Sequence, residues 1–196
     1  MLKPIEMAHK MLKEIIKVND VVVDATMGNG YDTLFLAELG AEVYAFDVQE
    51  AALEATEIRL KNARIATQRL TKDRKILLTD SSVKLILAGH EFLADYVKKS
   101  VTAAIFNLGY LPKTDKSVIT RAETTLKALE ELTHQLVVGG RIAIMIYYGH
   151  EGGLEEKEAV INWVSALPQK DWEVLSYAPL NQIHTPPLLV VIERRK

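Results

Sequence analysis

The 196-residue sequence contains no cysteine, which excludes disulfide bonds and thiolate chemistry. It has no apolar run long enough to span a membrane. Its first residues, Met1 to Glu6, include an acid and lack the apolar core of a secretory signal. We therefore expect a cytoplasmic protein with no membrane partner.

The sequence also lacks an excess of positive charge, since 24 Lys and Arg residues face 26 Asp and Glu residues and the net charge is -2. A protein that binds nucleic acid by charge alone is usually basic, so any RNA contact must be local. One local basic run exists, for which a solvated helix face and loop is the simpler interpretation. It consists of Arg59, Lys61, Arg64, Arg69, Lys72, Arg74 and Lys75.

The length suits a single domain, residues 1–196, with a sizeable core. Apolar periodicity predicts strands at 21–24, 42–47, 83–87, 103–107, 141–148, 173–177 and 188–193. Helices are predicted at 5–17, 33–39, 50–62, 92–99, 120–137 and 154–167. This alternation predicts an α/β fold in which a seven-stranded, mostly parallel sheet carries helices on both faces. The last two strands have no helix between them, which favours a C-terminal antiparallel pair.

Two segments carry more specific expectations. Thr120 and Glu123 have the spacing of a capping box, which predicts that a helix begins there. The segment 63–83 has no clear pattern, and the sequence leaves it open between a helix extension and a surface insertion.

A nucleotide-cofactor site is predicted where the strand Val21–Asp24 enters the turn Gly28-Asn29-Gly30. The glycines let the backbone approach a ligand closely. The next strand ends on Asp47, an acid that can bind a ribose diol. Ligands of parallel sheets bind at the carboxyl ends of the strands, where these residues should meet.

The residues after the turn indicate which cofactor binds. The third glycine of the dinucleotide fingerprint is missing, and Asp32 would place negative charge where a pyrophosphate should lie. S-adenosylmethionine has an ammonium and a sulfonium but no phosphate. We expect Asp24 and Asp32 to hold its ammonium, Asp47 its ribose hydroxyls, and His90 to lie near its adenine. Each acid taken alone is also compatible with a helix cap or a turn.

Several motifs along nearly the whole chain carry a family resemblance. They are Val22–Gly30, Asp32-Thr33, Phe46–Gln49, Gly89-His90-Glu91, Asn107–Pro112, Asp115–Ser117, Tyr147–His150 and Leu180–Gln182. On these motifs the sequence resembles class I S-adenosylmethionine-dependent methyltransferases with a Rossmann-like fold. Within them it is similar to the small YtqB/MnmM family, once labelled rRNA methylases. The segment 63–83 is longer than the family pattern.

The resemblance implies methylation of 5-aminomethyl-2-thiouridine at the tRNA wobble position, which gives 5-methylaminomethyl-2-thiouridine. It implies the tRNA anticodon stem-loop as partner. Other readings stay open: an rRNA or small-molecule amine substrate, a nicotinamide-dependent oxidoreductase, or a non-catalytic module that retains the fold. The sequence indicates no metal, and it leaves a homodimer open.

The segment from Asn107 to Tyr110 looks like a variant of the (Asp/Asn)-Pro-Pro-(Tyr/Phe) loop of amino-group methyltransferases. In that arrangement the Asn107 side-chain oxygen and a backbone carbonyl accept the amine hydrogens, while Tyr110 stacks on the base, a contact worth roughly 1–3 kcal/mol. The amine must lose a proton first, and the candidate acceptors are Asp32, His90, Tyr110, His150 or water. His9 and His184 receive no role from the sequence.

The candidate residues fall into three sets. The cofactor set is Asp24, Thr26, Gly28, Asn29, Gly30, Asp32, Thr33, Asp47, Gln49, His90, Glu91 and Asn107. The catalytic set is Asn107, Tyr110 and His150. The substrate set is Tyr110, Pro112, Lys113, Lys116 and Arg121, whose basic members we expect to contact tRNA phosphates.

Overall fold

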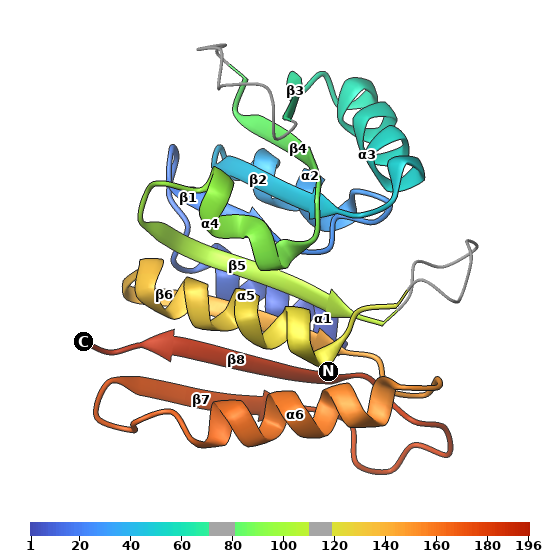
Figure 1. Ribbon diagram of the computed structural model, residues 1–196, viewed down its shortest axis with the longest axis vertical. Helices are drawn as coiled ribbons and strands as arrows, with labels where there is room; N and C mark the ends of the chain where they lie inside the picture. The colour runs from blue at the N-terminus through green and yellow to red at the C-terminus, as the bar shows by residue number, and fades with distance from the viewer. Residues whose placement is uncertain (71–80, 110–118) are drawn as a thin grey trace.

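The computed structural model describes residues 1–70, 81–109 and 119–196, and their strands form one sheet in the order β3-β4-β2-β1-β5-β6-β8-β7 (Figure 1). The strands are β1 Val21–Asp24, β2 Glu42–Asp47, β3 Thr67–Leu70, β4 Val83–Leu87, β5 Val101–Leu108, β6 Leu136–Ile146, β7 Trp172–Tyr177 and β8 Leu188–Arg194. The helices are α1 Pro4–Lys13, α2 Tyr31–Glu38, α3 Glu50–Asn62, α4 Leu93–Tyr96, α5 Ala122–Gln135 and α6 Gly153–Ser165, with a 3-10 turn at His90–Phe92.

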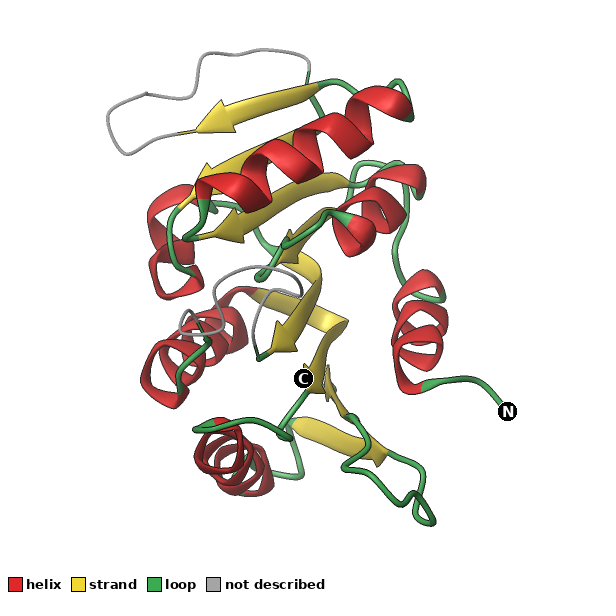
Figure 2. Ribbon diagram, turned by 90° about the vertical axis from the view of Figure 1, so that its right-hand side faces the viewer, coloured by secondary structure: helices red, strands yellow, loops and turns green. Residues whose placement is uncertain are grey.

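The sheet is parallel from β3 to β6, and β8 runs antiparallel to both β6 and β7. The Rossmann-like α/β architecture and the C-terminal antiparallel pair are therefore confirmed. Figure 2 shows helices on both sides of the sheet. The buried residues Leu12, Leu36 and Leu60 place α1, α2 and α3 on one face, while Leu129 and Val160 place α5 and α6 on the other.

The predicted count of seven strands is wrong, because residues 67–70 form β3 beside β4 at the edge of the sheet. Only Leu70 of its four residues is buried, so β3 has no hydrophobic period to read. Several boundaries also differ, the largest being that β6 begins at Leu136 rather than at residue 141, that α1 ends at Lys13 rather than at residue 17, and that α4 ends at Tyr96 rather than at residue 99. Within the described residues no helix is both long and apolar enough to cross a membrane.

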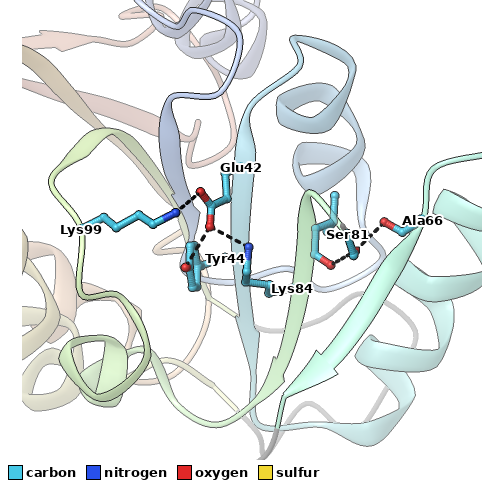
Figure 3. A network of polar contacts seen from close by, with 7 residues as sticks. Glu42, Tyr44, Ala66, Ser81, Lys84 and Lys99 are labelled. Carbon is cyan, nitrogen blue, oxygen red and sulfur yellow. Dashed lines mark hydrogen bonds and ion pairs between the residues drawn. The ribbon is translucent and has the colours of Figure 1, made fainter. Parts of the chain in front are cut away.

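A charged cluster ties the amino-terminal ends of the strands together (Figure 3). Glu42 at the start of β2 accepts hydrogen bonds from Lys84 Nζ at 2.7 Å, Lys99 Nζ at 2.6 Å and the Tyr44 hydroxyl at 3.1 Å. Burial alone would raise the pKa of Glu42, but the two lysines and the tyrosine lower it to about 2. Opposite charges at this end of the sheet therefore hold β2, β4 and the segment before β5 together.

Candidate functional site

A cavity of about 750 Å³ opens at the carboxyl ends of β1, β2, β4 and β5. This volume lies in the usual range for small-molecule sites. Most of the predicted cofactor residues line it, namely Thr26, Gly28, Asn29, Asp32, Asp47, Gln49, His90, Glu91 and Asn107. The parallel topology brings together these residues, which are up to 81 positions apart in sequence.

The glycine turn is shaped by α3 as much as by any ligand. Gly30 has a left-handed φ of 76°, and a Cβ there would lie 2.7 to 2.9 Å from atoms of Thr56. The Thr56 hydroxyl donates to the Gly28 carbonyl at 3.1 Å, and Arg59 Nε donates to the Asn29 carbonyl at 2.6 Å. Gly30 is therefore required for the packing of α2 against α3, and it is not among the cavity-lining residues.

Asp24 and Thr33 stand behind the cavity wall. Asp24 is fully buried at the end of β1, where it accepts hydrogen bonds from the Thr33 hydroxyl at 2.6 Å and the Thr26 amide at 3.2 Å. The expectation that Asp24 contacts the cofactor directly is not supported, since neither residue lines the cavity. Burial, with the charge of Asp32 added to it, raises the pKa of Asp24 to about 7 despite both hydrogen bonds.

Asp47 couples the end of β2 to the glycine turn. Its carboxylate accepts hydrogen bonds from the Gly28 amide at 3.1 Å and the Gln49 amide at 3.0 Å. Burial raises the pKa of Asp47, and these backbone donors oppose the shift. Each carboxylate oxygen retains capacity to accept another donor from the cavity that Asp47 lines.

Asp32 is shared by two residues of the cavity wall. Asn107 Nδ2 donates to Asp32 Oδ2 at 2.6 Å, and His9 Nε2 lies 2.5 Å from Asp32 Oδ1. Because an ionised carboxylate only accepts, the Asn107 side-chain nitrogen faces Asp32, and the Asn107 side-chain oxygen takes no part in this contact. The Asn107 backbone amide is held by the Thr26 hydroxyl at 2.7 Å. Asn107 is therefore positioned through both its side chain and its main chain.

His9 is the residue of this group that the sequence missed. It comes from α1, far from any motif, and its ring stacks on Phe35 with centroids 4.0 Å apart and planes 10° apart. A lone histidine on an amphipathic helix gives no signal of its own. Only the contact with Asp32, 23 positions away, reveals it.

His90 presents an acceptor inside the protein. Its Nδ1 lies 3.0 Å from the Ala25 carbonyl, so Nδ1 carries the hydrogen and Nε2 keeps a lone pair. Among the described residues, Nε2 has no hydrogen-bond partner. Burial lowers the pKa of His90, which favours this neutral form. A donor on a bound ligand would satisfy Nε2.

Gly109 and Thr120, which lie shortly after Asn107, are held together beside the buried carboxylate of Glu156. Gly109 and Thr120 exchange hydrogen bonds, the Gly109 amide to the Thr120 hydroxyl at 2.8 Å and the Thr120 amide to the Gly109 carbonyl at 2.9 Å. The Thr120 hydroxyl donates to Glu156 at 2.6 Å, and Thr125 donates to the other oxygen of Glu156 at 2.7 Å. The predicted capping box is wrong, because α5 begins after Arg121 without a side-chain cap and Thr120 bonds α6 instead.

The remaining predicted residues divide clearly. Arg121 lines the cavity. His150 does not line the cavity. It packs beside Gly109, since a Cβ added to Gly109 would lie 3.5 Å from His150 Cε1. Four predicted residues, Tyr110, Pro112, Lys113 and Lys116, lie outside the described residues.

The charge of the cavity favours a cationic ligand. Among the described residues that line the cavity, three are acids, namely Asp32, Asp47 and Glu91. Arg121 is the single arginine in this described part of the lining, which contains no lysine. A dinucleotide would bring its phosphates against these acids, whereas S-adenosylmethionine would bring a sulfonium and an ammonium. The residues present therefore fit the methyl donor.

Comparison with known proteins agrees with this geometry. Residues 43–193 match the profile of the family described as "Putative rRNA methylase". The chain belongs to this family. It is an S-adenosylmethionine-dependent methyltransferase, as the sequence predicted.

Three relatives document the membership. The chain is 36% identical to the chloroplastic tRNA (mnm(5)s(2)U34)-methyltransferase of Arabidopsis thaliana, over 98% of this chain and 70% of that one. SMU.1697c of Streptococcus mutans, solved in complex with SAH, is 46% identical with a TM-score of 0.87 and covers 99% of both chains. An rRNA methylase of Streptococcus thermophilus is 43% identical with a TM-score of 0.82, over 100% of this chain and 99% of that one.

Proposed function

We propose that this methyltransferase converts 5-aminomethyl-2-thiouridine at the wobble position of tRNA to 5-methylaminomethyl-2-thiouridine. One observation carries the choice of an amine: Asp32 holds the Asn107 amide so that its oxygen is left to accept amine hydrogens. The name of the Arabidopsis relative supports the choice of tRNA. Residues 1–196 act as one domain in this proposal, and the reaction takes place in the cytoplasm.

The methyl donor binds along the strand ends. When bound, S-adenosylmethionine supplies a methyl group on a positively charged sulfur. Asp47 and Gln49 hold the ribose hydroxyls, and His90 with Glu91 faces the adenine, where the free Nε2 of His90 accepts a hydrogen bond. The charge of Asp32 favours the cationic end of the cofactor. Asp24 and Thr33 support the turn from behind through Thr26.

Asn107 orients the substrate amine. Its side-chain oxygen accepts one amine hydrogen, which turns the nitrogen lone pair toward the transferred methyl group. Such alignment of nucleophile and electrophile is the main catalytic contribution available here, since no covalent intermediate is needed. The hydrogen bond from Thr120 to Glu156 holds Thr120 in place beside Gly109, two residues after Asn107, while the amine binds.

The RNA approaches over the rim that contains Arg121. We assign phosphate contacts to Arg121, Lys113 and Lys116, and stacking on the flipped base to Tyr110 beside Pro112. These contacts position the anticodon stem-loop without reading much sequence. The charge needed for RNA is thereby local, in a chain whose net charge is -2.

The test is a methylation assay with S-adenosylmethionine and three acceptors. These are tRNA carrying 5-aminomethyl-2-thiouridine, ribosomal RNA, and the free 5-aminomethyl-2-thiouridine nucleoside. Mass spectrometry of the digested nucleosides is expected to show 5-methylaminomethyl-2-thiouridine from tRNA. Methylation of ribosomal RNA alone would refute the tRNA assignment, and equal rates with the free nucleoside would identify a small-molecule amine methyltransferase.

A further inference from the structure

Tyr31 and Arg59 form a stacked pair that the proposed function leaves without a task. Tyr31, the first residue of α2, lines the cavity and is 66% exposed, so it lies at the cavity mouth. The Arg59 guanidinium lies over its ring, 3.6 Å from the ring centroid. We propose that this pair binds the RNA outside the target nucleotide, with the ring stacked on an unpaired base and the guanidinium on a nearby phosphate. This inference rests on the proposed methylation of tRNA.

Two contacts hold the Arg59 side chain against the glycine turn. Its Nε donates to the Asn29 carbonyl at 2.6 Å, and its Cζ lies over the Tyr31 ring. Arg59 does not line the cofactor cavity. Within the described part of the chain, its two terminal nitrogens donate no hydrogen bond and make no ion pair. Because a guanidinium presents five N–H donors in a fixed fork, these nitrogens remain available to an anion outside the cavity.

Arg69 on β3 is the contrasting member of the same basic run. Its guanidinium contacts Glu50 at 2.5 Å and Glu57 at 2.7 Å, so α3 already balances its charge. Arg59 on α3 has no such carboxylate among the residues that the structure describes. The run therefore does not act as one solvated face, since one arginine is neutralised and another is held in place with its charge unbalanced. Three further members, Lys72, Arg74 and Lys75, lie outside the described residues.

The Tyr31 ring keeps one face for a ligand. Arg59 covers the other face, and within the described ranges no aromatic ring stacks on Tyr31. Val48, which also lines the cavity and is exposed, extends the apolar surface of the rim. A nucleic-acid base offers a flat π surface to such an aromatic side chain, and the stacking tolerates any base. An exposed ring backed by an arginine therefore suits an unpaired nucleotide.

The topology places this pair across the cavity from Arg121. Helices α2 and α3 pack on one face of the sheet, whereas α5, which follows Arg121, packs on the other. The cavity opens between these faces at the carboxyl ends of the strands. An RNA strand that enters there meets a cation on each side, while the buried Asp32 faces the methyl donor. This charge pattern suits a polyanion that inserts one nucleotide and keeps the rest outside.

The test measures binding of tRNA that carries 5-aminomethyl-2-thiouridine to the SAH-loaded protein, by fluorescence anisotropy at several salt concentrations. Tyr31→Leu removes the flat ring but leaves the hydrogen bonds of the glycine turn in place. We expect its affinity for tRNA to fall about 5- to 100-fold, the size of one lost base stack, with an unchanged salt dependence. Tyr31→Phe keeps the ring and should bind as wild type does.

The Arg59 variants test the phosphate contact separately. Arg59→Gln should weaken binding and lower the slope of log affinity against log salt by about 0.7, the value for one contact with a single strand. Arg59→Lys keeps the charge and should retain the wild-type slope. Lys170→Gln is the matched control, because it removes an exposed cation beside the start of β7, at the opposite end of the sheet from the cavity. It should leave both the affinity and the slope unchanged.

SAH affinity, measured by calorimetry, distinguishes an RNA contact from a cofactor contact. Tyr31→Leu should bind SAH as wild type does. A loss of SAH affinity in Tyr31→Leu, with tRNA binding at saturating SAH unchanged, would assign the ring to the cofactor and overturn the proposal. Wild-type tRNA affinity in both Tyr31→Leu and Arg59→Gln would overturn it as well. Failure of the proposed function is distinguishable, since wild type itself would then yield no methylaminomethyl product from this tRNA.

Discussion

The two ends of the sheet shift the pKa of their carboxylates in opposite directions. At the amino-terminal end, Glu42 meets Lys84 and Lys99, which hold its pKa at about 2. At the carboxyl end, Asp24 is buried beside Asp32, and its pKa rises to about 7. At the amino-terminal end the lysines neutralise the carboxylate, whereas at the carboxyl end acids lie next to one another. Such like-charge clusters lower stability and are typical of sites that a ligand completes, here a cationic cofactor.

The largest expected effect concerns the pH dependence of stability at Asp24. Its pKa is about 7 in the folded protein and 3.8 when unperturbed, so the folded state retains a proton that the unfolded chain has lost. Stability contributed at this position is therefore greatest at low pH and declines as pH rises between these values, by about 1.4 kcal/mol per pH unit. In Asp24→Asn the side-chain oxygen can still accept from the Thr26 amide, and the side-chain nitrogen can donate to the Thr33 hydroxyl, so both contacts can persist while this decline is removed.

Urea unfolding of wild type and Asp24→Asn between pH 5 and pH 8 measures this difference. The variant should gain stability relative to wild type as pH rises. If unfolding free energy changes with pH equally in the two proteins, Asp24 does not have a raised pKa, and the contrast between the two ends of the sheet is wrong.

The next effect is on activity rather than stability. Asn107→Ala removes the oxygen assigned to the substrate amine and leaves the cavity acids in place. We expect single-turnover methylation of tRNA to fall about 10²-fold, equivalent to about 3 kcal/mol, through lost alignment. SAH affinity and unfolding free energy should change little. Glu42→Gln, at the other end of the sheet, is the matched control and should leave the rate per folded molecule unchanged.

Glu42→Gln should instead lower stability. Lys84 is 7% exposed, so loss of the charge on Glu42 leaves a buried ammonium with neutral partners only. We expect unfolding free energy at pH 7 to fall by about 2 kcal/mol. The pKa of Glu42 lies below its ordinary value of 4.5, so its contribution is present above that pH and is lost as pH falls toward 2. Equal stability of variant and wild type at pH 7 would remove the contrast between the two ends.

The position of the cofactor site at the carboxyl end of the sheet was predictable from the sequence, but the contacts that hold its residues in place were not. The end of a buried strand can be located in the sequence as the end of an apolar run. The glycine turn and the acids Asp24 and Asp47 stand at such ends, and this placement predicts a cofactor site. His9 and Glu156 escaped, since their partners lie 23 and 36 positions away on other elements and neither residue belongs to a motif. An acid within a helix normally suggests a solvated face, yet Glu156 is 3% exposed.

The smallest effect separates the two lysines that share Glu42. The side chain of Lys99 is 59% exposed, whereas that of Lys84 is 9% exposed and lies 4.7 Å from the centre of the Tyr44 ring. Lys99→Met should therefore cost less than about 1 kcal/mol of unfolding free energy, as for other exposed pairs. That cost should decrease further at high salt, because solvent ions screen exposed charges. If Lys99→Met costs as much as Glu42→Gln, the three charges act as one unit, and neutralisation at this end depends on both lysines rather than on the buried pair.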